Sequence, residues 1–183
     1  MKKVILVLSI SLLIFSCKTQ QNTAKKNVKK EITAVKNERG DLVGSADRTS
    51  FMEEPYNTWF NTGYDGYKVD LETAKEIKEH IKGVTVKGFM GTWCGDSKRE
   101  TPHFYKIADE VGFDGNIDLV TVNRSKKTPE NLQEGYNIIR VPTFIFYRDG
   151  KEIGRFVEYP RDTLEKDILK IVSGQDYKHS YER

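Results

Sequence analysis

The sequence predicts an α/β fold in which a mixed β-sheet carries helices on both faces. The first observation is an alternation of two patterns from Asp70 onward: segments with apolar residues at helical spacing, and short apolar runs rich in β-branched residues. The second is their order, α-β-α-β-α-β-β-α, which predicts one sheet of mixed direction covered by helices. The third is length, since 183 residues leave room for one domain with a proper core.

The boundaries of these elements follow from helix caps and glycines. Asp70 is a good N-cap for the first helix, and Gly83 ends it. Gly112 and Gly174 end two later helices in the same way. The expected helices cover residues 71–81, 97–111, 129–136 and 162–172, and the expected strands cover residues 84–90, 117–122, 143–147 and 152–157.

Residues 1–16 predict a signal peptide of the bacterial lipoprotein type. Lys2 and Lys3 precede an apolar run, which ends in Ile-Phe-Ser followed by Cys17. The run is short for a membrane span and fits the apolar region of a secretory signal. Its end resembles a lipobox, in which signal peptidase II cleaves before a lipid-modified cysteine, although Phe15 is bulky for that pattern. An uncleaved anchor and an ordinary signal with an incidental cysteine are the alternatives.

The lipoprotein interpretation places the protein in the cell envelope of a bacterium, held to the membrane by a lipid on Cys17 and facing the periplasm or the exterior. Residues 17–31 are polar and predict a flexible tether, and residues 175–183 form a polar tail. With Cys17 lipidated, Cys94 is the single free thiol, which excludes an internal disulfide. We expect a monomer.

Residues 32–69 form an N-terminal extension that precedes the α/β domain of residues 70–174. Two short apolar stretches around a turn at Gly40 predict a β-hairpin within residues 32–46. Aromatic residues follow, namely Tyr56, Trp59, Phe60, Tyr64 and Tyr67. Two interpretations stay open: the rings pack the extension onto the domain, which is the simpler, or they form a lip beside a functional site.

Charge and metal-ligand residues exclude several classes of function. The formal net charge is +3 with both signs abundant, so no large basic face is expected. The sequence has no zinc-ligand spacing and no aromatic–basic interleaving, and we expect no nucleic-acid partner. Three histidines, His80, His103 and His179, assemble no metal cluster and are expected at the surface or in packing. Glu100 and Asp109 are expected as solvated helix charges. No metal and no cofactor are expected.

The stretch that carries chemistry follows the first expected strand of the domain and reads Trp93, Cys94, Gly95, Asp96 and Ser97. A cysteine at a helix N-terminus meets unpaired backbone N–H groups and the positive end of the macrodipole, which stabilise its thiolate. The charge of Asp96 opposes that effect. Ser97 can donate a hydrogen bond to the thiolate but cannot act as a resolving thiol. Any reaction here therefore uses one sulfur.

Four features together resemble the thioredoxin family over residues 70 to about 173. They are Trp93-Cys94 at the strand-to-helix turn, Pro102 five residues beyond Ser97, Val141-Pro142-Thr143 at a strand start, and Gly150 with Gly154 in the last hairpin. The resemblance implies a thioredoxin-like fold, with Cys94 as the nucleophile of thiol–disulfide exchange. It also implies a cis peptide bond at Pro142, facing Cys94, and places Thr143 where specificity is partly set.

This sequence departs from the family at the second cysteine, so its motif Cys-Gly-Asp-Ser is a monothiol CxxS variant. The family's buried acid would fall at Gly88, and the two losses agree because that acid helps to activate the missing thiol. Two function classes follow. One is a monothiol redox protein that exchanges with a small thiol or with a thiol- or disulfide-bearing protein and needs an external resolving thiol. The other is a redox-silent binding module. Retention of Trp93, Cys94 and Gly95 favours the first.

Overall fold

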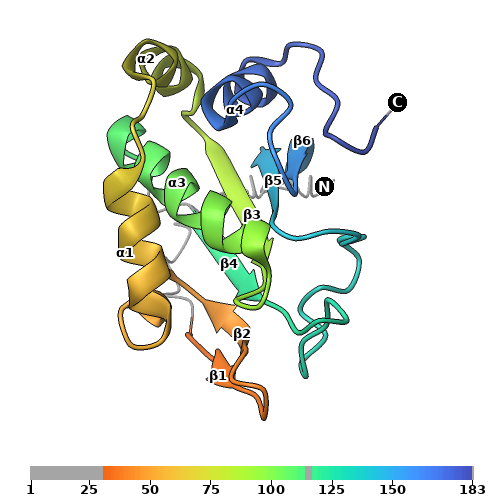
Figure 1. Cartoon of the computed structure of the whole chain (residues 1–183). Helices are drawn as coiled ribbons and strands as arrows, with labels where there is room; N and C mark the ends of the chain where they lie inside the picture. Colours follow the sequence, from red (N-terminus) through yellow and green to blue (C-terminus); the bar gives the residue numbers. More distant parts are fainter. Residues whose placement is uncertain (1–30, 114–116, 183) are drawn as a thin grey trace, which may run out of the picture. The chain divides into compact units, whose positions relative to one another are not determined.

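The computed structural model describes residues 31–113 and 117–182, and they build a six-stranded mixed sheet (Figure 1). The strands are β1 (Val35–Lys36), β2 (Leu42–Ala46), β3 (Val84–Met90), β4 (Ile117–Thr121), β5 (Thr143–Arg148) and β6 (Lys151–Val157). The helices are the 3-10 turn η1 (Arg48–Phe51), α1 (Tyr56–Gly66), α2 (Leu71–His80), α3 (Gly95–Val111) and α4 (Leu164–Ser173). The expected signal peptide, Cys17 and most of the expected tether lie outside the described residues.

Within the described residues the strand order is β1-β2-β4-β3-β5-β6, and β3 with β4 is the only parallel pair there. The parallel pair requires a crossover, which α3 supplies, while the tight turn at Asp149 and Gly150 joins β5 to β6. All four strands expected in the domain are found with both ends within one residue of the expected bounds. The mixed sheet of the predicted fold is confirmed.

One face of the sheet packs against the helices. Phe144 on β5 stacks on Phe104 of α3 with ring centroids 4.2 Å apart. Gly154 on β6 lies on the same face, where a Cβ would come within 3.0 Å of Ile171 on α4. Figure 1 shows α1 beside α3 and α2 beside α4, and residues of all four helices join this main core. Burial of large apolar side chains here supplies most of the driving force for folding.

The opposite face is covered by the segment between β4 and β5. Phe89, Val120 and Ile145 form a second cluster on it, and Leu132 and Tyr136 from residues 123–142 pack against that cluster. The prediction of a helix over residues 129–136 is wrong, because this segment forms a series of turns. Asn131 and Gly135 adopt left-handed φ values of 55° and 82°. The Thr128 side chain also accepts a hydrogen bond from the Leu132 N–H, which competes with helical bonding.

The N-terminal extension is part of the same sheet. Val35 pairs with Val43 in an antiparallel hairpin, and β2 then pairs antiparallel with β4, placing Gly44 opposite Thr121. Helix α1 lies against α3 at a close contact, where a Cβ on Gly63 would come within 2.7 Å of the Pro102 ring. Pro102 lies within α3, the helix that begins at the Cys94 motif, and it also forms the contact surface for α1 of the extension.

The aromatic residues of the extension pack into the main core, as the simpler interpretation held. Phe60 stacks on Phe51 and meets Tyr105 edge-on, with ring centroids 5.3 and 5.8 Å apart. Arg48 forms two hydrogen bonds to Asp109, which also accepts a hydrogen bond from the Tyr64 hydroxyl. Burial alone would raise the pKa of Asp109, but the hydrogen bonds from Arg48 and Tyr64 outweigh it and lower that pKa. The expectation of a solvated Asp109 is therefore wrong: it fastens the extension to α3.

No helix within the described ranges is long and apolar enough to cross a bilayer.

Gly88, at the position of the family's buried acid, is tightly packed. A Cβ on Gly88 would lie 2.8 Å from Leu119 Cδ1 and 3.2 Å from Phe144 Cδ1. We expect Gly88→Ala to lower the free energy of unfolding by about 1–3 kcal/mol, because it overpacks the core. Chemical denaturation measures the change. Gly66→Ala is the matched control, since a Cβ there meets nothing within 4 Å; equal stability of the two variants would contradict the prediction.

Candidate functional site

Cys94 lies at the N-terminus of α3, directly after the loop that follows β3. Its φ and ψ of −94° and 128° are extended, and its carbonyl accepts the first helical hydrogen bond, from the Lys98 N–H at 3.0 Å, so it is the N-cap. The helix begins at Gly95, two residues earlier than expected. The cysteine is partly exposed, so its sulfur is accessible to a reaction partner. The helix terminus favours its thiolate.

The loop that contains Pro142 faces the cysteine, as the resemblance implies. Antiparallel pairing of β3 with β5 sets Phe89 opposite Thr143, which brings the start of β5 beside the loop after β3. The Val141–Pro142 peptide bond is cis. The Cys94 thiol donates a hydrogen bond to the Val141 carbonyl oxygen at 3.2 Å. A carbonyl oxygen can only accept, so the thiol is the donor in this contact.

Ser97 holds the active-site loop rather than the sulfur. Its side chain is fully buried, and its Oγ accepts a hydrogen bond from the Gly91 N–H at 3.2 Å. The expected hydrogen bond from Ser97 to Cys94 is not found among the described residues. The hydroxyl therefore satisfies a buried backbone donor that a second cysteine would satisfy less well, because sulfur is a weak acceptor.

Charge beside the cysteine is balanced within the first turns of α3. Asp96 lies 2.7 Å from Arg99, which also reaches the Glu100 carboxylate at 2.7 Å. Arg99 thus offsets part of the negative charge that opposes the thiolate. Glu100 is only 3% exposed, so the expectation that it is solvated is wrong. Its Oε1 accepts a hydrogen bond from Arg99 Nε, and its Oε2 lies 3.8 Å from His103 Nδ1.

The Trp93 side chain reaches the end of β4. Its indole lies over Gly91, where a Cβ would come within 2.5 Å of the ring, and its Nε1–H donates to the Val122 carbonyl at 2.8 Å. The guanidinium of Arg124 lies 5.4 Å from the ring centroid, a cation–π distance. Sequence reasoning missed Arg124, because its place depends on the loop after β4 and no local pattern marks it.

Thr143 is buried, with 1% exposure, and its hydroxyl donates to the Arg140 carbonyl at 2.8 Å. The side chain therefore braces the loop around Pro142 and does not present itself to a client. Sequence reasoning also missed Thr92, whose Oγ1 accepts a hydrogen bond from the Leu42 N–H at 3.0 Å. This bond joins the hairpin of the extension to the residue two positions before Cys94.

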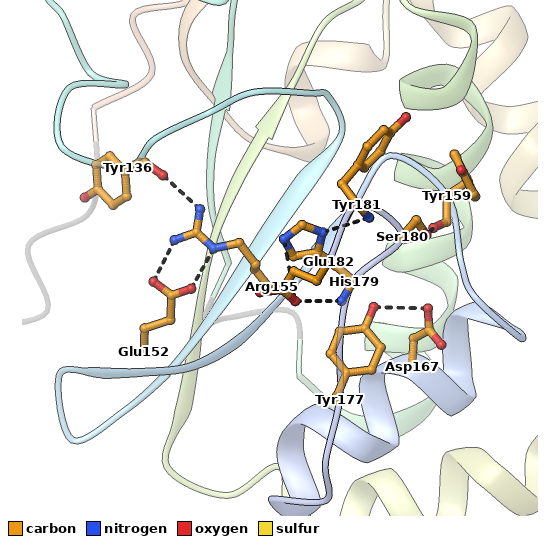
Figure 2. Close-up of polar contacts among 10 residues, drawn as sticks. All are labelled: Tyr136, Glu152, Arg155, Tyr159, Asp167, Tyr177, His179, Ser180, Tyr181 and Glu182. Atoms are coloured by element: carbon orange, nitrogen blue, oxygen red, sulfur yellow. Dashed lines mark hydrogen bonds and ion pairs between the residues drawn. The ribbon is translucent and has the colours of Figure 1, made fainter.

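The C-terminal tail packs beside the loop around Pro142. Figure 2 shows its hydrogen bonds to Tyr159 and Asp167. The Ser180 hydroxyl donates to the Tyr159 carbonyl at 2.6 Å, and the Tyr181 ring lies 5.1 Å from the Arg140 guanidinium. His179 accepts a hydrogen bond from the Tyr181 N–H on its Nδ1, and burial lowers the pKa of this imidazole. The tail is therefore an ordered part of the fold, and His179 serves in packing.

The two other histidines, His80 and His103, lie in packing or at a helix end. His103 stacks on Tyr67 with ring centroids 4.0 Å apart, and His80 lies at the end of α2. Within the part of the chain that the structure describes, no group of three or more histidine, cysteine, aspartate or glutamate residues could hold a metal ion.

Comparison with known proteins identifies this arrangement. The family model described as thioredoxin matches residues 68–170, more than half of the chain. The chain belongs to the thioredoxin family. A thioredoxin-like protein of Acanthamoeba polyphaga mimivirus is 32% identical over 101 residues, which are 55% of this chain and 70% of that protein. Thioredoxin of Gallus gallus is 28% identical over 58% of this chain and 95% of its own length.

The fold has a counterpart among solved structures. A protein of unknown function from Pseudomonas aeruginosa superimposes with a TM-score of 0.53 at 15% sequence identity, covering 71% of this chain and 93% of that one. At that identity the likeness concerns the fold alone. The strand pair β1–β2 and helix α1 lie before the residues that the thioredoxin family model matches.

Asp96→Asn is expected to raise the rate of Cys94 alkylation by iodoacetamide at neutral pH by about two- to fivefold. The substitution removes the carboxylate nearest the cysteine in the first turn of α3, and the limit on the gain reflects the charge that Arg99 already offsets. Asp162→Asn, at an exposed pair with Lys166, is the control and should leave the rate unchanged. A rate for Asp96→Asn equal to that of the control would contradict the prediction.

Proposed function

We propose that the protein performs monothiol thiol–disulfide exchange through Cys94 and depends on an external resolving thiol. The observation that carries this proposal is a partly exposed cysteine that caps α3 against the Val141 carbonyl and the cis Pro142 loop, with a buried serine at the position of the second thiol. Membership of the thioredoxin family supports the chemistry, since thiol–disulfide exchange is the reaction of that family.

The exchange proceeds in two displacements. The Cys94 thiolate attacks one sulfur of a client disulfide, forming a mixed disulfide and releasing the other client sulfur as a thiolate, which takes a proton from solvent. Ser97 cannot attack the new bond, so the mixed disulfide waits for a second thiolate from outside the chain. That thiolate forms a disulfide with one partner and returns Cys94 or the client to the thiol state. The cycle permits isomerisation, or reduction by an outside thiol.

A redox-silent binding module is the second candidate, and two observations favour it. The Cys94 thiol is already engaged as a hydrogen-bond donor to the Val141 carbonyl. Gly88, at the place of the family's buried acid, is packed so closely that it leaves no room for one. In this candidate the thioredoxin fold presents the surface around Pro142 and Trp93 to a partner, and the cysteine is incidental.

We further propose that the protein acts at the outer side of a bacterial membrane, held there by a lipid on Cys17. The supporting observation is the sequence itself: Lys2 and Lys3, a short apolar run, and Cys17 at its end. Cys17 lies outside the described residues, and the described domain begins at Glu31. The polar residues between them would give the domain reach from the membrane surface.

Trapping separates the two candidate functions. Incubated with a disulfide-bearing peptide, the wild type should accumulate a mixed disulfide at Cys94 that persists until another thiol is added, detected by non-reducing electrophoresis and intact mass. Ser97→Cys should shorten the lifetime of this adduct by at least about tenfold, because the new thiol attacks within the same molecule. Cys94→Ala should form no adduct in either background. A wild type without adducts, together with a Cys94→Ala variant that keeps the cellular role, would leave only the binding module.

The anchor is tested by intact mass and membrane fractionation of the protein expressed in its native envelope. The mature N-terminus should be a lipid-modified Cys17, and the protein should sediment with membranes. Cys17→Ala should abolish processing by signal peptidase II, whereas Ser16→Ala, the neighbouring conservative change, should be processed normally. A soluble form with an unmodified Cys17, cleaved at another position, would contradict the lipoprotein interpretation.

A further inference from the structure

A shallow basin of about 590 Å³ lies between the turn of the β1–β2 hairpin and the loop after β4. Its charged lining consists of Lys36, Glu38, Arg39, Asp41 and Arg124. Three cations and two carboxylates therefore face one space at neutral pH. The volume suits a small molecule, and the charges of both signs suit a ligand that itself carries both.

The carboxylate of Asp41 has one oxygen, Oδ2, that receives no hydrogen bond from the described residues. The residue is 7% exposed. The ion pair with Arg124 Nε is 3.9 Å long, which is beyond hydrogen-bond distance. Buried polar atoms in native proteins are nearly always hydrogen bonded, and a charged oxygen without a donor is costly. A ligand ammonium group in the basin would supply the missing donor.

Two guanidinium groups can receive a carboxylate. Arg124 lies at cation–π distance from the Trp93 ring, an interaction that occupies none of its N–H donors. Arg39 is exposed, and its side chain makes no hydrogen bond or ion pair with other residues of the described ranges. Lys36 is engaged, since its Nζ donates to the Glu54 carbonyl at 3.1 Å. Arginine is the side chain best shaped for bidentate carboxylate binding.

The basin shares a wall with the active-site loop. Arg124, at its rim, lies 5.4 Å from the Trp93 ring centroid, and Trp93 precedes Cys94. On the other side, the Leu42 N–H next to Asp41 donates to Thr92 Oγ1. A ligand seated in the basin would therefore lie beside the loop that carries the reactive sulfur.

We propose that this basin binds the amino-acid head group of a low-molecular-weight thiol, which acts as the resolving thiol of the exchange proposed above and so rests on it. The α-ammonium group binds Asp41, and the α-carboxylate binds Arg124 and Arg39. Because Trp93 adjoins the basin and Cys94 is the next residue, the head group and the sulfur must be several bonds apart, as they are in γ-glutamyl thiols.

The step balances without any other reactant. The thiolate of a bound ligand attacks Cys94 Sγ in the mixed disulfide, so that a Cys94–ligand disulfide forms as the Cys94–client bond breaks, and the client thiolate takes a proton from solvent. A second ligand thiolate then attacks the sulfur of the first ligand. This releases the Cys94 thiolate and the ligand disulfide. Two ligand thiols are oxidised for each client disulfide reduced.

The test loads Cys94 with thionitrobenzoate as a mixed disulfide and measures its release by three cysteine derivatives of equal length. γ-Glutamylcysteine carries both charges of the head group, glutaryl-cysteine lacks the ammonium, and 4-aminobutanoyl-cysteine lacks the carboxylate. γ-Glutamylcysteine should show saturation and react about fivefold faster than either analogue, the factor expected for one modest ion pair. S-methyl-γ-glutamylcysteine, which cannot react, should bind the wild type in a calorimetric titration. This binding should be lost in the variants Asp41→Asn and Arg124→Gln, which are expected to lose the rate advantage.

Three variants locate the effect. Asp41→Asn should abolish the advantage over glutaryl-cysteine, and Arg124→Gln should abolish the advantage over 4-aminobutanoyl-cysteine. Lys127→Gln makes the same charge change in the same loop but does not line the basin, and it should keep both advantages. Equal rates for the three derivatives in the wild type, or equal losses in Lys127→Gln and Arg124→Gln, would overturn this inference while leaving exchange at Cys94 intact. A Cys94 that accepts no thionitrobenzoate, or an adduct that no thiol releases, would instead overturn the proposed function.

Discussion

Antiparallel pairing between β3 and β5 is the constraint on which the rest of the site depends. It places Phe89 opposite Thr143, so the loop that ends in Cys94 and the loop that contains Pro142 leave the sheet at the same end. The thiol then meets the Val141 carbonyl at 3.2 Å. The N-terminus of α3 and this carbonyl therefore both lie against the same sulfur.

The two departures from the thioredoxin pattern are both built into the packing. Ser97 is fully buried and satisfies the Gly91 N–H, so the hydroxyl has a structural use that a thiol would serve poorly. Gly88 admits no side chain because Leu119 and Phe144 occupy the space beside it. The packing around Ser97 and the packing around Gly88 thus both fit the residue that is present, and not the family's second cysteine or buried acid. A new cysteine at position 97 would supply a resolving thiol but no buried acid to activate it, so the recovered dithiol activity should stay modest.

Local patterns foretold most of the fold, and the exceptions have physical causes. Asp70 accepts hydrogen bonds from the Glu72 and Thr73 N–H groups as an N-cap should, and Gly112 ends α3 in a left-handed conformation. The helix predicted after β4, over residues 129–136, does not form. Asn131 and Gly135 adopt positive φ there, and side-chain hydrogen bonds replace helical ones. At the site, sequence located Cys94 and the cis Pro142. It could not locate Arg124 or Thr92, whose roles arise only when the extension folds against the loop after β4.

The hairpin of the extension also changes how the sheet ends. The residues that match the family model contribute β3 to β6, and in that set β4 would present a row of unpaired backbone N–H and C=O groups. Strand β2 pairs with β4 and covers this row, and the sheet then finishes in β1, which is only two residues long. So short a border offers little template for another chain to add a strand. The segment that shapes the approach to the sulfur therefore also protects the domain against association through this edge.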